Sequence, residues 1–325
     1  MRRVSLVTGA TGFAGSHLVE HLLEHEGEVA AWSNPGGKPS DERPGVRWAA
    51  VDLLDGAAVR GALERLQPSA VYHCAGFADV AASWKQPERA LRVNALGTSH
   101  LLEAVRHAAL DCPVLVTGSA LVYKASQEPI HEDSPVEPSS PYGVSKLAQE
   151  MIAAAAPLAR VLLVRPFNHA GPRQSDAYVT SSFARQIAEI EAGRREPVLR
   201  VGNLDTRRDI TDVRDTVRAY RAIIDRGLPR RPYNVCSGHA YLVRDLLAAL
   251  VHLARVPIRI ETDPARMRPS DNPVVVGDNS RIREEVGWRA EIPIEHTLAD
   301  LLEHWRGVGG QTGVRPVSDR GQTGV

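Results

Sequence analysis

The chain has 325 residues, of which 43% are hydrophobic and 24% charged, so it is long and apolar enough to bury a substantial core. Lysine plus arginine and aspartate plus glutamate number 39 each, which leaves no net charge and no basic field for nucleic acid or a membrane surface. The three cysteines, Cys74, Cys112 and Cys236, are far apart and form no CxxC pair, so we expect neither a metal site nor a disulfide scaffold.

The chain begins MRRVSLVTGATGF and has no long apolar region there, and no apolar run elsewhere approaches the roughly 20 residues that span a bilayer. We therefore expect a cytoplasmic protein. Short, almost continuously apolar runs then predict strands at 4–8, 29–33, 46–51, 70–75, 114–118 and 161–166. Between them, amphipathic patterns predict a helix from about Phe13 and others near 56–66, 87–109 and 142–156.

This alternation predicts an α/β fold, a Rossmann-type doubly wound parallel sheet that occupies residues 1–165. After Pro166, loops rich in Pro, Gly and Arg separate helices expected near 177–192, 212–226, 241–254 and 294–306. We expect residues 166–306 to form mostly a smaller substrate-binding cap over the carboxyl edge of the sheet, with segments near 212–236 rejoining the first domain. The Gly-rich tail, 307–325, repeats GQTGV and is expected to be disordered.

A glycine-rich loop joins the first expected strand to the first helix. VTGATGFAG places Gly9, Gly12 and Gly15 where a tight turn, a close backbone approach to a pyrophosphate and close packing of helix on strand are needed. The N-terminus of the following helix offers amide groups and a positive dipole to phosphates. An ordinary glycine-rich turn is the alternative, but the strand–turn–helix context favours dinucleotide binding.

The end of the second expected strand indicates which dinucleotide is bound. An acidic residue there would accept hydrogen bonds from the ribose hydroxyls of NAD, but Ser33 ends the strand, Asn34 follows it and no acid occurs before Asp41. Both side chains can donate to a 2′-phosphate, so we expect NADPH as the preferred cofactor and NADH as the alternative. Lys38 or Arg43 would reach the same phosphate unless they are solvated loop charges.

Asp52 follows the third expected strand in VDLLD. Its carboxylate can accept from the adenine amino group, or it can cap the helix at 56–66.

A serine, a tyrosine and a lysine suggest the chemistry. In SPYGVSK (140–146), Tyr142 and Lys146 are four residues apart, so one helical turn stacks them on one face. A phenol with a pKa of about 10 is a poor proton donor at neutral pH, and an ammonium one turn away is expected to lower that pKa. Lys146 can also hold the nicotinamide ribose. Ser119, at the end of the fifth strand, would hydrogen-bond a substrate carbonyl oxygen. Such a Tyr–Lys pair also arises by chance, but the glycine loop and Ser119 favour a catalytic site.

Together, TGATGFAG, the strand-end Ser119 and the pair Tyr142 and Lys146 resemble the extended short-chain dehydrogenase/reductase family, from Val4 to about Trp305. RPFNHAGPRQ (165–174), FARQIAEIEAG (183–193), VGNLDTRRDITDVRD (201–215), YNVCSG (233–238) and RMRPSDNP (266–273) resemble its GDP-mannose branch. The resemblance implies an oxidoreductase that binds a GDP-sugar, and a homodimer joined through a four-helix bundle by helices 87–109 and 142–156. The Ala153–Ala156 run would allow those helices to approach closely.

The resemblance also implies the site residues, which we name by role. The catalytic residues would be Ser119, Tyr142 and Lys146. The residues expected to bind the cofactor are Gly9, Thr11, Gly12, Phe13, Ala14, Gly15, Ser33, Asn34, Asp52, Leu53, Ala75, Gly76, Tyr142 and Lys146. The residues expected to bind the substrate are Ser119, Asn168, Val179, Arg208, Arg268 and Asp271.

The chemistry of the substrate-binding residues suits a nucleotide diphosphate. Asn168 can donate to it unless it only forms a turn, and Arg208 and Arg268 carry fork-shaped donors for phosphate oxygens. Asp271 would accept from a base or ribose unless it is a loop acid, and Val179 would contact the nucleotide unless it lies in the core.

The residues beside Ser119 favour one reaction. A 4,6-dehydratase needs a general acid/base there to move the C5 proton and expel water from C6, but Ala120 and Leu121 carry no ionisable group. Glu128 and Glu132 follow in what we expect to be an exposed loop. The missing acid favours reduction over dehydration, and the resemblance implies the substrate: reduction of the C4 ketone of GDP-4-dehydro-6-deoxy-D-mannose to GDP-6-deoxy-D-mannose (GDP-D-rhamnose).

The sequence leaves three alternatives open: dehydration of GDP-mannose, 4-epimerisation of a nucleotide sugar with tightly held NAD, and a catalytically silent dinucleotide-binding protein. The missing acid after the second strand disfavours the epimerase, and the intact Ser119, Tyr142 and Lys146 disfavour the silent protein.

Overall fold

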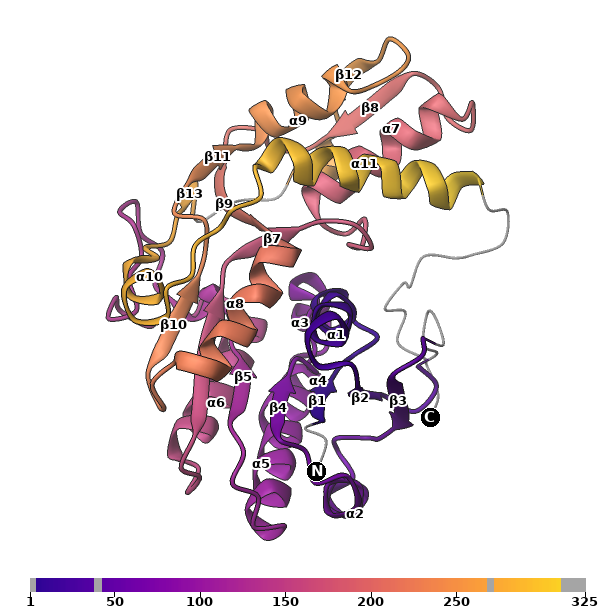
Figure 1. The fold of residues 1–325 in the computed structure, drawn as a ribbon. Coiled ribbons are helices and arrows are strands. Elements are labelled where there is room, and N and C mark those ends of the chain that lie inside the picture. The colour runs from indigo at the N-terminus through magenta and orange to yellow at the C-terminus, as the bar shows by residue number, and fades with distance from the viewer. Residues whose placement is uncertain (1–3, 38–42, 268–271, 311–325) are drawn as a thin grey trace.

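A computed structural model describes residues 4–37, 43–267 and 272–310 and consists of a sheet flanked by helices with a smaller cap over one end (Figure 1). The expected α/β, Rossmann-type fold is confirmed: seven strands pair in the order β3-β2-β1-β4-β5-β6-β10, and all of the pairs are parallel. These strands are β1 (Ser5–Thr8), β2 (Val29–Ser33), β3 (Val46–Ala50), β4 (Ala70–His73), β5 (Val114–Thr117), β6 (Val161–Pro166) and β10 (Pro232–Val235). The order reverses between β1 and β4, and ligands of such sheets bind at that point, beyond the carboxyl ends of the strands.

Each face of the sheet carries its own hydrophobic core, because successive side chains of a strand point to opposite faces. Leu6 packs with α2 (Gly56–Leu66), α5 (Gly97–His107) and α6 (Pro141–Ala155), whereas Val7 packs with helices on the other face. Those helices are α1 (Phe13–Glu26), α8 (Val213–Arg226) and α10 (Ser280–Val286). Burial on both faces explains why most of the strand sequences are almost continuously apolar.

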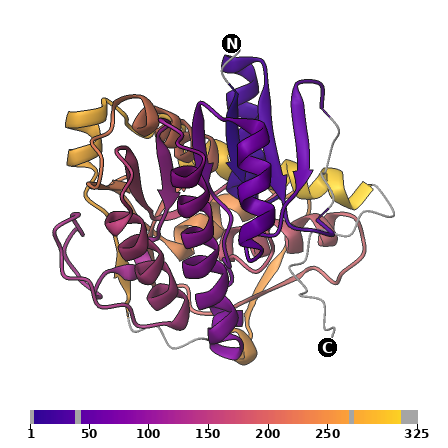
Figure 2. The same ribbon diagram turned by 90° about the horizontal axis from the view of Figure 1, so that it is seen from below.

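The predicted strands and helices of the first half are confirmed within a few residues, with one difference. The helix expected over 87–109 is divided into α4 (Pro87–Leu91), a π-helical turn η1 (Arg92–Leu96) and α5, and a short helix α3 (Val80–Lys85) precedes it. A π-helical turn often occurs at a functional site, and this one carries the buried Asn94. Seen from below, α5 and α6 lie side by side in front of the sheet (Figure 2).

The Ala153–Ala156 run faces inward for the most part. Ala153 and Ala156 belong to the core under α6, whereas Met151 on the same helix is 64% exposed. The run therefore serves packing on the chain's own sheet.

The cap contains strands that the helical patterns did not predict. Its helices are α7 (Val179–Glu191), α9 (Val243–His252) and α11 (Ile294–Gly310), and its strands are β7 (Asn168–Ala170), β8 (Val198–Val201), β9 (Arg207–Asp212), β11 (Ala240–Leu242), β12 (Arg259–Thr262) and β13 (Val274–Val275). The three helices share a core with β8 and β9. Because β6 runs directly into β7, the cap lies over the carboxyl ends of the strands (Figure 1).

The chain does not stay in the cap once it has entered it. It returns to the sheet as α8 and β10 between β9 and β11. The last helix, expected to end at 306, continues to Gly310, and the remainder of the expected tail lies outside the described residues. Among the helices that the structure describes, we find none with the length and apolar character of a membrane span.

Candidate active site

The glycine loop has the geometry that a dinucleotide needs. Gly9 has a positive φ of 67°, and a Cβ there would lie 2.6 Å from the backbone of Ala75. A Cβ on Gly15 would collide with the carbonyl oxygen of Gly9, so α1 packs on the loop too closely for any other residue. Gly12 is exposed and immediately precedes α1, whose first amide groups have no carbonyl partners within the helix. These residues therefore fit a pyrophosphate at the N-terminus of α1, and Thr11, Phe13 and Ala14 are half-buried around it.

The two residues after β4 connect this loop to the expected catalytic residues. Ala75 lies against Gly9, and a Cβ on Gly76 would lie 2.7 Å from Asn94 Oδ1 and 3.6 Å from Lys146 Nζ. The structure thus brings the glycine loop, Gly76 and Lys146 into one site.

At the end of β2, the Ser33 hydroxyl is buried and donates to the carbonyl of Gly37 over 3.4 Å, and Asn34 is exposed. The interpretation of Arg43 as a phosphate ligand is not supported, because Arg43 forms an ion pair with Glu20 of α1 at 2.7 Å. Lys38 and Asp41 lie outside the described residues.

The alternative role of Asp52 as a helix cap is wrong. Asp55 caps α2 by accepting from the amides of Ala57 and Ala58, whereas Asp52 Oδ1 accepts from the amide of Leu54 over 2.9 Å. Asp52 is half-buried.

Leu53 holds the start of α5 from the same loop. Its carbonyl accepts from His100 over 2.9 Å, and its side chain lies against Gly97.

Ser119 and Tyr142 meet at the carboxyl end of β5. Ser119 is only 7% exposed, and its hydroxyl accepts from the amide of Leu121 over 3.1 Å and hydrogen-bonds the phenol of Tyr142. Ser140 caps α6 by accepting from the amide of Gly143, which fixes the first turn of the helix where Tyr142 lies. These two residues, 23 positions apart in the sequence, are brought together because the short 3-10 turn η2 (Ala120–Val122), which follows Ser119, packs against α6.

The electrostatics of this pair differ from what the sequence predicted. Burial raises the pKa of the Tyr142 phenol, the nearby Tyr178 raises it further, and the hydrogen bond from Ser119 lowers it. Lys146 is not the group that sets this pKa, because its ammonium points inward and donates to the carbonyl of Thr117 over 2.7 Å. Burial lowers the pKa of Lys146 itself to about 8. Tyr142 is therefore protonated over the whole neutral range and can act as a proton donor.

Several buried polar residues behind the site were missed by the sequence reasoning. Asn94 accepts from the amide of Phe77 over 2.7 Å and donates to Ser145 Oγ over 2.8 Å, and Gln149 accepts from Lys146. The spacing of Gln149, three residues after Lys146, was the available signal for the last contact. Nothing in the sequence pattern marks Asn94, because its role depends on the π-helical turn.

A buried ion pair also holds α6 to the sheet. Arg165 of β6 donates to both carboxylate oxygens of Glu150, over 2.9 and 2.5 Å, and to the carbonyl of Glu132 over 3.0 Å. Its guanidinium lies 4.7 Å from the centre of the Tyr123 ring. Glu150 lies one helical turn after Lys146, so the pair anchors the same helix that carries the expected catalytic residues.

Three of the residues expected to bind substrate, Asn168, Val179 and Arg208, lie on the cap side. Asn168 is exposed at the start of β7, and next to it His169 stacks on Phe13 of the glycine loop, with ring centres 5.6 Å apart. Val179 begins α7 and is 40% exposed, so it is not a core residue. The preceding Tyr178 acts on the pKa of Tyr142, which places this end of α7 beside the pair Ser119 and Tyr142.

Arg208 lies on β9, half-buried, and donates to the carbonyl of Arg207 over 2.8 Å and to that of Pro273 over 3.3 Å. Burial lowers the pKa of its guanidinium. Arg268 and Asp271 lie outside the described residues.

The two acids that follow Ser119 differ in exposure. The first acid, Glu128, is exposed as expected. The apolar Leu121, closer to Ser119 in the chain, is 43% exposed. The expectation that Glu132 is an exposed loop acid is wrong: it is buried, accepts from the amide of Asn234 over 2.9 Å and lies 3.6 Å from Arg281. These contacts fix its carboxylate, so it is not free to move toward Ser119 as a general acid.

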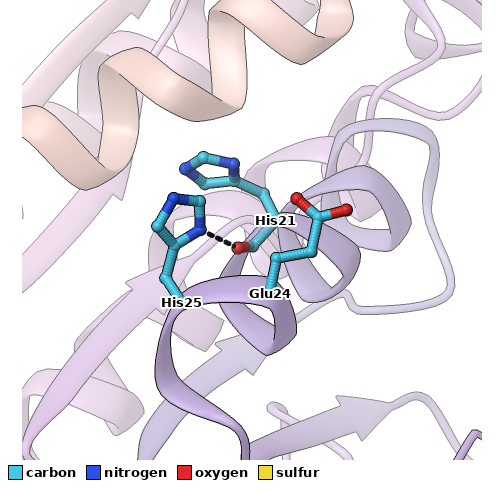
Figure 3. Close-up of side chains that lie close together, drawn as sticks. All are labelled: His21, Glu24 and His25. Carbon is cyan, nitrogen blue, oxygen red and sulfur yellow. Dashed lines mark hydrogen bonds between the residues drawn. The ribbon is translucent and has the colours of Figure 1, made fainter.

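One cluster outside this site has the composition of a metal site. His21, Glu24 and His25 of α1 have potential ligand atoms within 4.8 Å of one another, and His25 Nδ1 donates to the carbonyl of His21 (Figure 3). Burial, His25 and the charges of Arg221 and Arg218 lower the pKa of His21 to about 4. The same positive charges oppose a cation, so we assign no metal to this cluster.

The chain is similar in both sequence and structure to enzymes that act on GDP-linked sugars. Residues 6–301 match the family model described as GDP-mannose 4,6 dehydratase. The chain is 37% identical over 305 residues to GDP-6-deoxy-D-mannose reductase of Pseudomonas aeruginosa, covering 92% of this chain and 96% of that protein. It is 27% identical over 348 residues to a GDP-mannose 4,6-dehydratase of Vibrio cholerae, covering 93% of each. The structure of RMD from Pseudomonas aeruginosa complexed with NADPH superposes with a TM-score of 0.82 at 34% identity, covering 94% of this chain and 99% of that one.

Proposed function

Because the chain belongs to the GDP-mannose 4,6 dehydratase family, we propose that it is an NADPH-dependent reductase of a GDP-linked keto sugar. The reaction is reduction of the C4 ketone of GDP-4-dehydro-6-deoxy-D-mannose to GDP-6-deoxy-D-mannose, which is GDP-D-rhamnose. The relative that is 37% identical carries the name of this activity, and the named dehydratase compared above is more distant, at 27% identity.

The observation that carries the choice of reduction over dehydration is the hydrogen-bonded pair Ser119 and Tyr142 with apolar residues beside it. Reduction of a ketone needs a hydride, one proton and a group that holds the carbonyl oxygen. Dehydration needs in addition a group that removes the C5 proton and protonates the C6 hydroxyl. Ala120 and Leu121 cannot do this, and Glu132 is fixed by Asn234 and Arg281.

The glycine loop would hold the pyrophosphate of the cofactor. The exposed Asn34 would donate to its 2′-phosphate, and Ser33 would do so by exchanging its long hydrogen bond to the Gly37 carbonyl. Leu53 and Asp52 lie at the end of β3, where the adenine of a dinucleotide would lie. When bound, NADPH supplies the hydride that adds to C4 of the sugar. NADPH and NADH oxidation at equal concentrations should differ clearly, and comparable rates would contradict the assignment.

In the proton-transfer step, the phenol of Tyr142 donates its proton to the carbonyl oxygen as negative charge develops there. The Ser119 hydroxyl donates a hydrogen bond to the same oxygen and orients the ketone. Lys146 holds the cofactor ribose from the inner side of the site. Because burial raises its pKa, the Tyr142 phenol carries its proton at neutral pH, which is the form that a donor needs, and the same shift makes it a weaker acid than a free phenol.

On the cap side, Asn168, Val179 and Arg208 would contact the nucleotide diphosphate, and Arg268 and Asp271 would complete that site. A planar guanidinium can pair with two phosphate oxygens at once, which suits the arginines to this role.

We extend the proposal to a homodimer in which α6 and the helical segment 87–109, which comprises α4, η1 and α5, form a four-helix bundle with the same helices of a second copy. Exposed apolar side chains occur on α6 and on the helical segments beside it: Leu91 (44%), Leu96 (40%), Val144 (49%) and Met151 (64%). Exposed apolar residues on neighbouring helical segments favour burial against a second copy. A monomer in sedimentation velocity at micromolar concentration would contradict this.

We also propose a cytoplasmic location. Cys74, Cys112 and Cys236 are all free, as is usual in a reducing compartment.

A coupled assay tests the function directly. GDP-mannose is converted by a known GDP-mannose 4,6-dehydratase, this protein is added, and loss of NADPH absorbance is followed together with formation of GDP-6-deoxy-D-mannose by NMR. NADPH consumption that depends on both proteins supports reduction. Consumption of GDP-mannose by this protein alone, without net NADPH loss, would instead identify a dehydratase.

A further inference from the structure

A continuous chain of buried hydrogen bonds begins at Lys146 and crosses the sheet layer. The ammonium donates to Gln149 Oε1 over 2.6 Å, and Gln149 Nε2 donates to Thr98 Oγ1 over 2.9 Å. From Thr98 the chain continues to His73 Nε2 at 2.8 Å, and from His73 Nδ1 to Thr8 Oγ1 at 2.8 Å. None of these five side chains is more than 5% exposed. The chain therefore connects α6, α5, β4 and β1 without water.

The direction of each bond follows from what its neighbours can donate. An ammonium has no lone pair, so the oxygen of the Gln149 amide must face Lys146 and its NH₂ must face Thr98. The Thr98 hydroxyl lies 2.6 Å from the carbonyl oxygen of Asn94, so its single proton goes there. His73 Nε2 must then carry a proton and donate to Thr98.

The far end of the chain agrees with this direction. Burial and the charge of Lys146 lower the pKa of His73 to about 3, so its imidazole is neutral and Nδ1 accepts from the Thr8 hydroxyl. Thr8 Oγ1 in turn accepts from the amide of Ala75 over 3.3 Å. Every member of the chain is satisfied in one arrangement only, so Gln149 cannot rotate without leaving a buried polar group unpaired.

The consequence for Lys146 concerns its three N–H groups. Thr117 O and Gln149 Oε1 take two of them, which leaves one for a partner on the cofactor side of the site. Burial by itself favours the neutral amine of Lys146, and the two acceptors oppose that tendency by binding its protons.

We propose that Gln149, locked by Thr98 and His73, is a positioning residue that fixes the Lys146 ammonium and aims its remaining N–H at the cofactor. This role rests on the proposed function, in which Lys146 holds the cofactor ribose. It adds a residue that contacts neither cofactor nor substrate.

Three variants and one control test the role. Gln149→Met keeps the length of the side chain and removes the acceptor for Lys146. Thr98→Val removes only the partner that orients Gln149, and Thr98→Ser restores the hydroxyl. Gln186→Met is the matched control. Gln186 is a buried glutamine of α7 in the cap, and its side chain hydrogen-bonds the backbone of Arg200 instead of a member of the chain that begins at Lys146. Each purified protein is measured for NADPH affinity by nicotinamide fluorescence, for kcat and KM with the keto sugar, for the pH profile of kcat and for its unfolding midpoint.

The expected loss in Gln149→Met is on the order of tenfold to a hundredfold in kcat, the effect of one charge-assisted hydrogen bond, together with weaker NADPH binding and little change in KM for the sugar. The alkaline limb of the pH profile should move to lower pH, because the charged form of Lys146 has lost an acceptor. Thr98→Val should show a smaller loss of the same kind, and Thr98→Ser should recover most of it.

The proposal is overturned if Gln149→Met retains NADPH affinity and kcat within twofold of the unmodified protein, or if Gln186→Met loses as much of both. If Gln149→Met does not fold, the Thr98 pair decides, and equal impairment of folded Thr98→Ser and Thr98→Val overturns it. NADPH binding needs no sugar, so a wrong substrate assignment would abolish turnover in every protein and still leave the affinity differences intact.

Discussion

Substituting Glu150 with methionine removes the partner of a charge that lies buried beneath α6. Glu150 and Arg165 have side chains that are 10% and 6% exposed, and two charge-assisted hydrogen bonds join them. Breaking a buried pair by removing one partner costs about 3–5 kcal/mol, because the other charge is left uncompensated. We therefore expect Glu150→Met to lower the free energy of unfolding by about that amount. Arg165 then keeps neutral partners, the Glu132 carbonyl and the side chain of Tyr123, neither of which compensates its charge.

The double variant Glu150→Met/Arg165→Met provides the decisive comparison. Two methionines fill a similar volume and leave no buried charge, so the double variant should recover the loss and be more stable than Glu150→Met by about 3–5 kcal/mol. Equilibrium urea unfolding followed by tryptophan fluorescence measures all the proteins, and a double-mutant cycle gives the coupling energy. Additive effects of the two substitutions would refute the reasoning, because they would mean that the charges do not depend on each other.

Three further predictions concern the site and the pH dependence of stability. Tyr142→Phe should reduce kcat by about 10²–10⁴-fold while NADPH affinity changes little, and unchanged turnover would mean that Tyr142 is not the proton donor. Leu121→Glu places a carboxylate at a position that is 43% exposed and should change the free energy of unfolding by less than about 0.5 kcal/mol. NMR in D₂O should detect no exchange of the sugar C5 proton, and such exchange would mean that this one acid is enough to complete a dehydratase site. Burial lowers the pKa of His73 to about 3 and that of His17 to about 4. Below about pH 6.5 the unfolded chain therefore binds more protons than the folded chain, and the free energy of unfolding decreases as the pH is lowered. Urea unfolding should show roughly 2 kcal/mol lost per histidine between pH 7 and pH 5, and equal stability at both pH values would contradict these shifts.

The hydrophobic pattern predicted the sheet well, because burial on both faces leaves a direct mark on sequence. The strand at 29–33 and the helix at 56–66 have the predicted bounds. The pattern was less informative in the cap, where short strands such as β7 and β11 are too brief to show a period. It therefore predicted only the helices there.

Ser119, Tyr142 and Lys146 could be found because their types, their spacing and their places after a strand and at a helix start are local properties. The partners of buried polar groups are not local. Lys146 was expected to act on Tyr142 one turn away, but the carbonyl of Thr117 on the neighbouring strand binds its ammonium. Glu132 was expected in solvent, but it accepts from Asn234, more than 100 residues later, because β10 pairs beside β6. Such contacts depend on which strands become neighbours.

The route of the chain between sheet and cap limits how the two parts can be separated. The chain passes from β6 into β7, returns from β9 into α8, and passes again from β10 into β11. A fragment ending at residue 165 would lack β10, so β6 would become an open edge, and the side chains that α8 covers would meet water. No single cut yields a transplantable cap. Grafting a different sugar specificity onto this cofactor domain therefore requires exchange of surface loops, since the cap cannot be exchanged as a block.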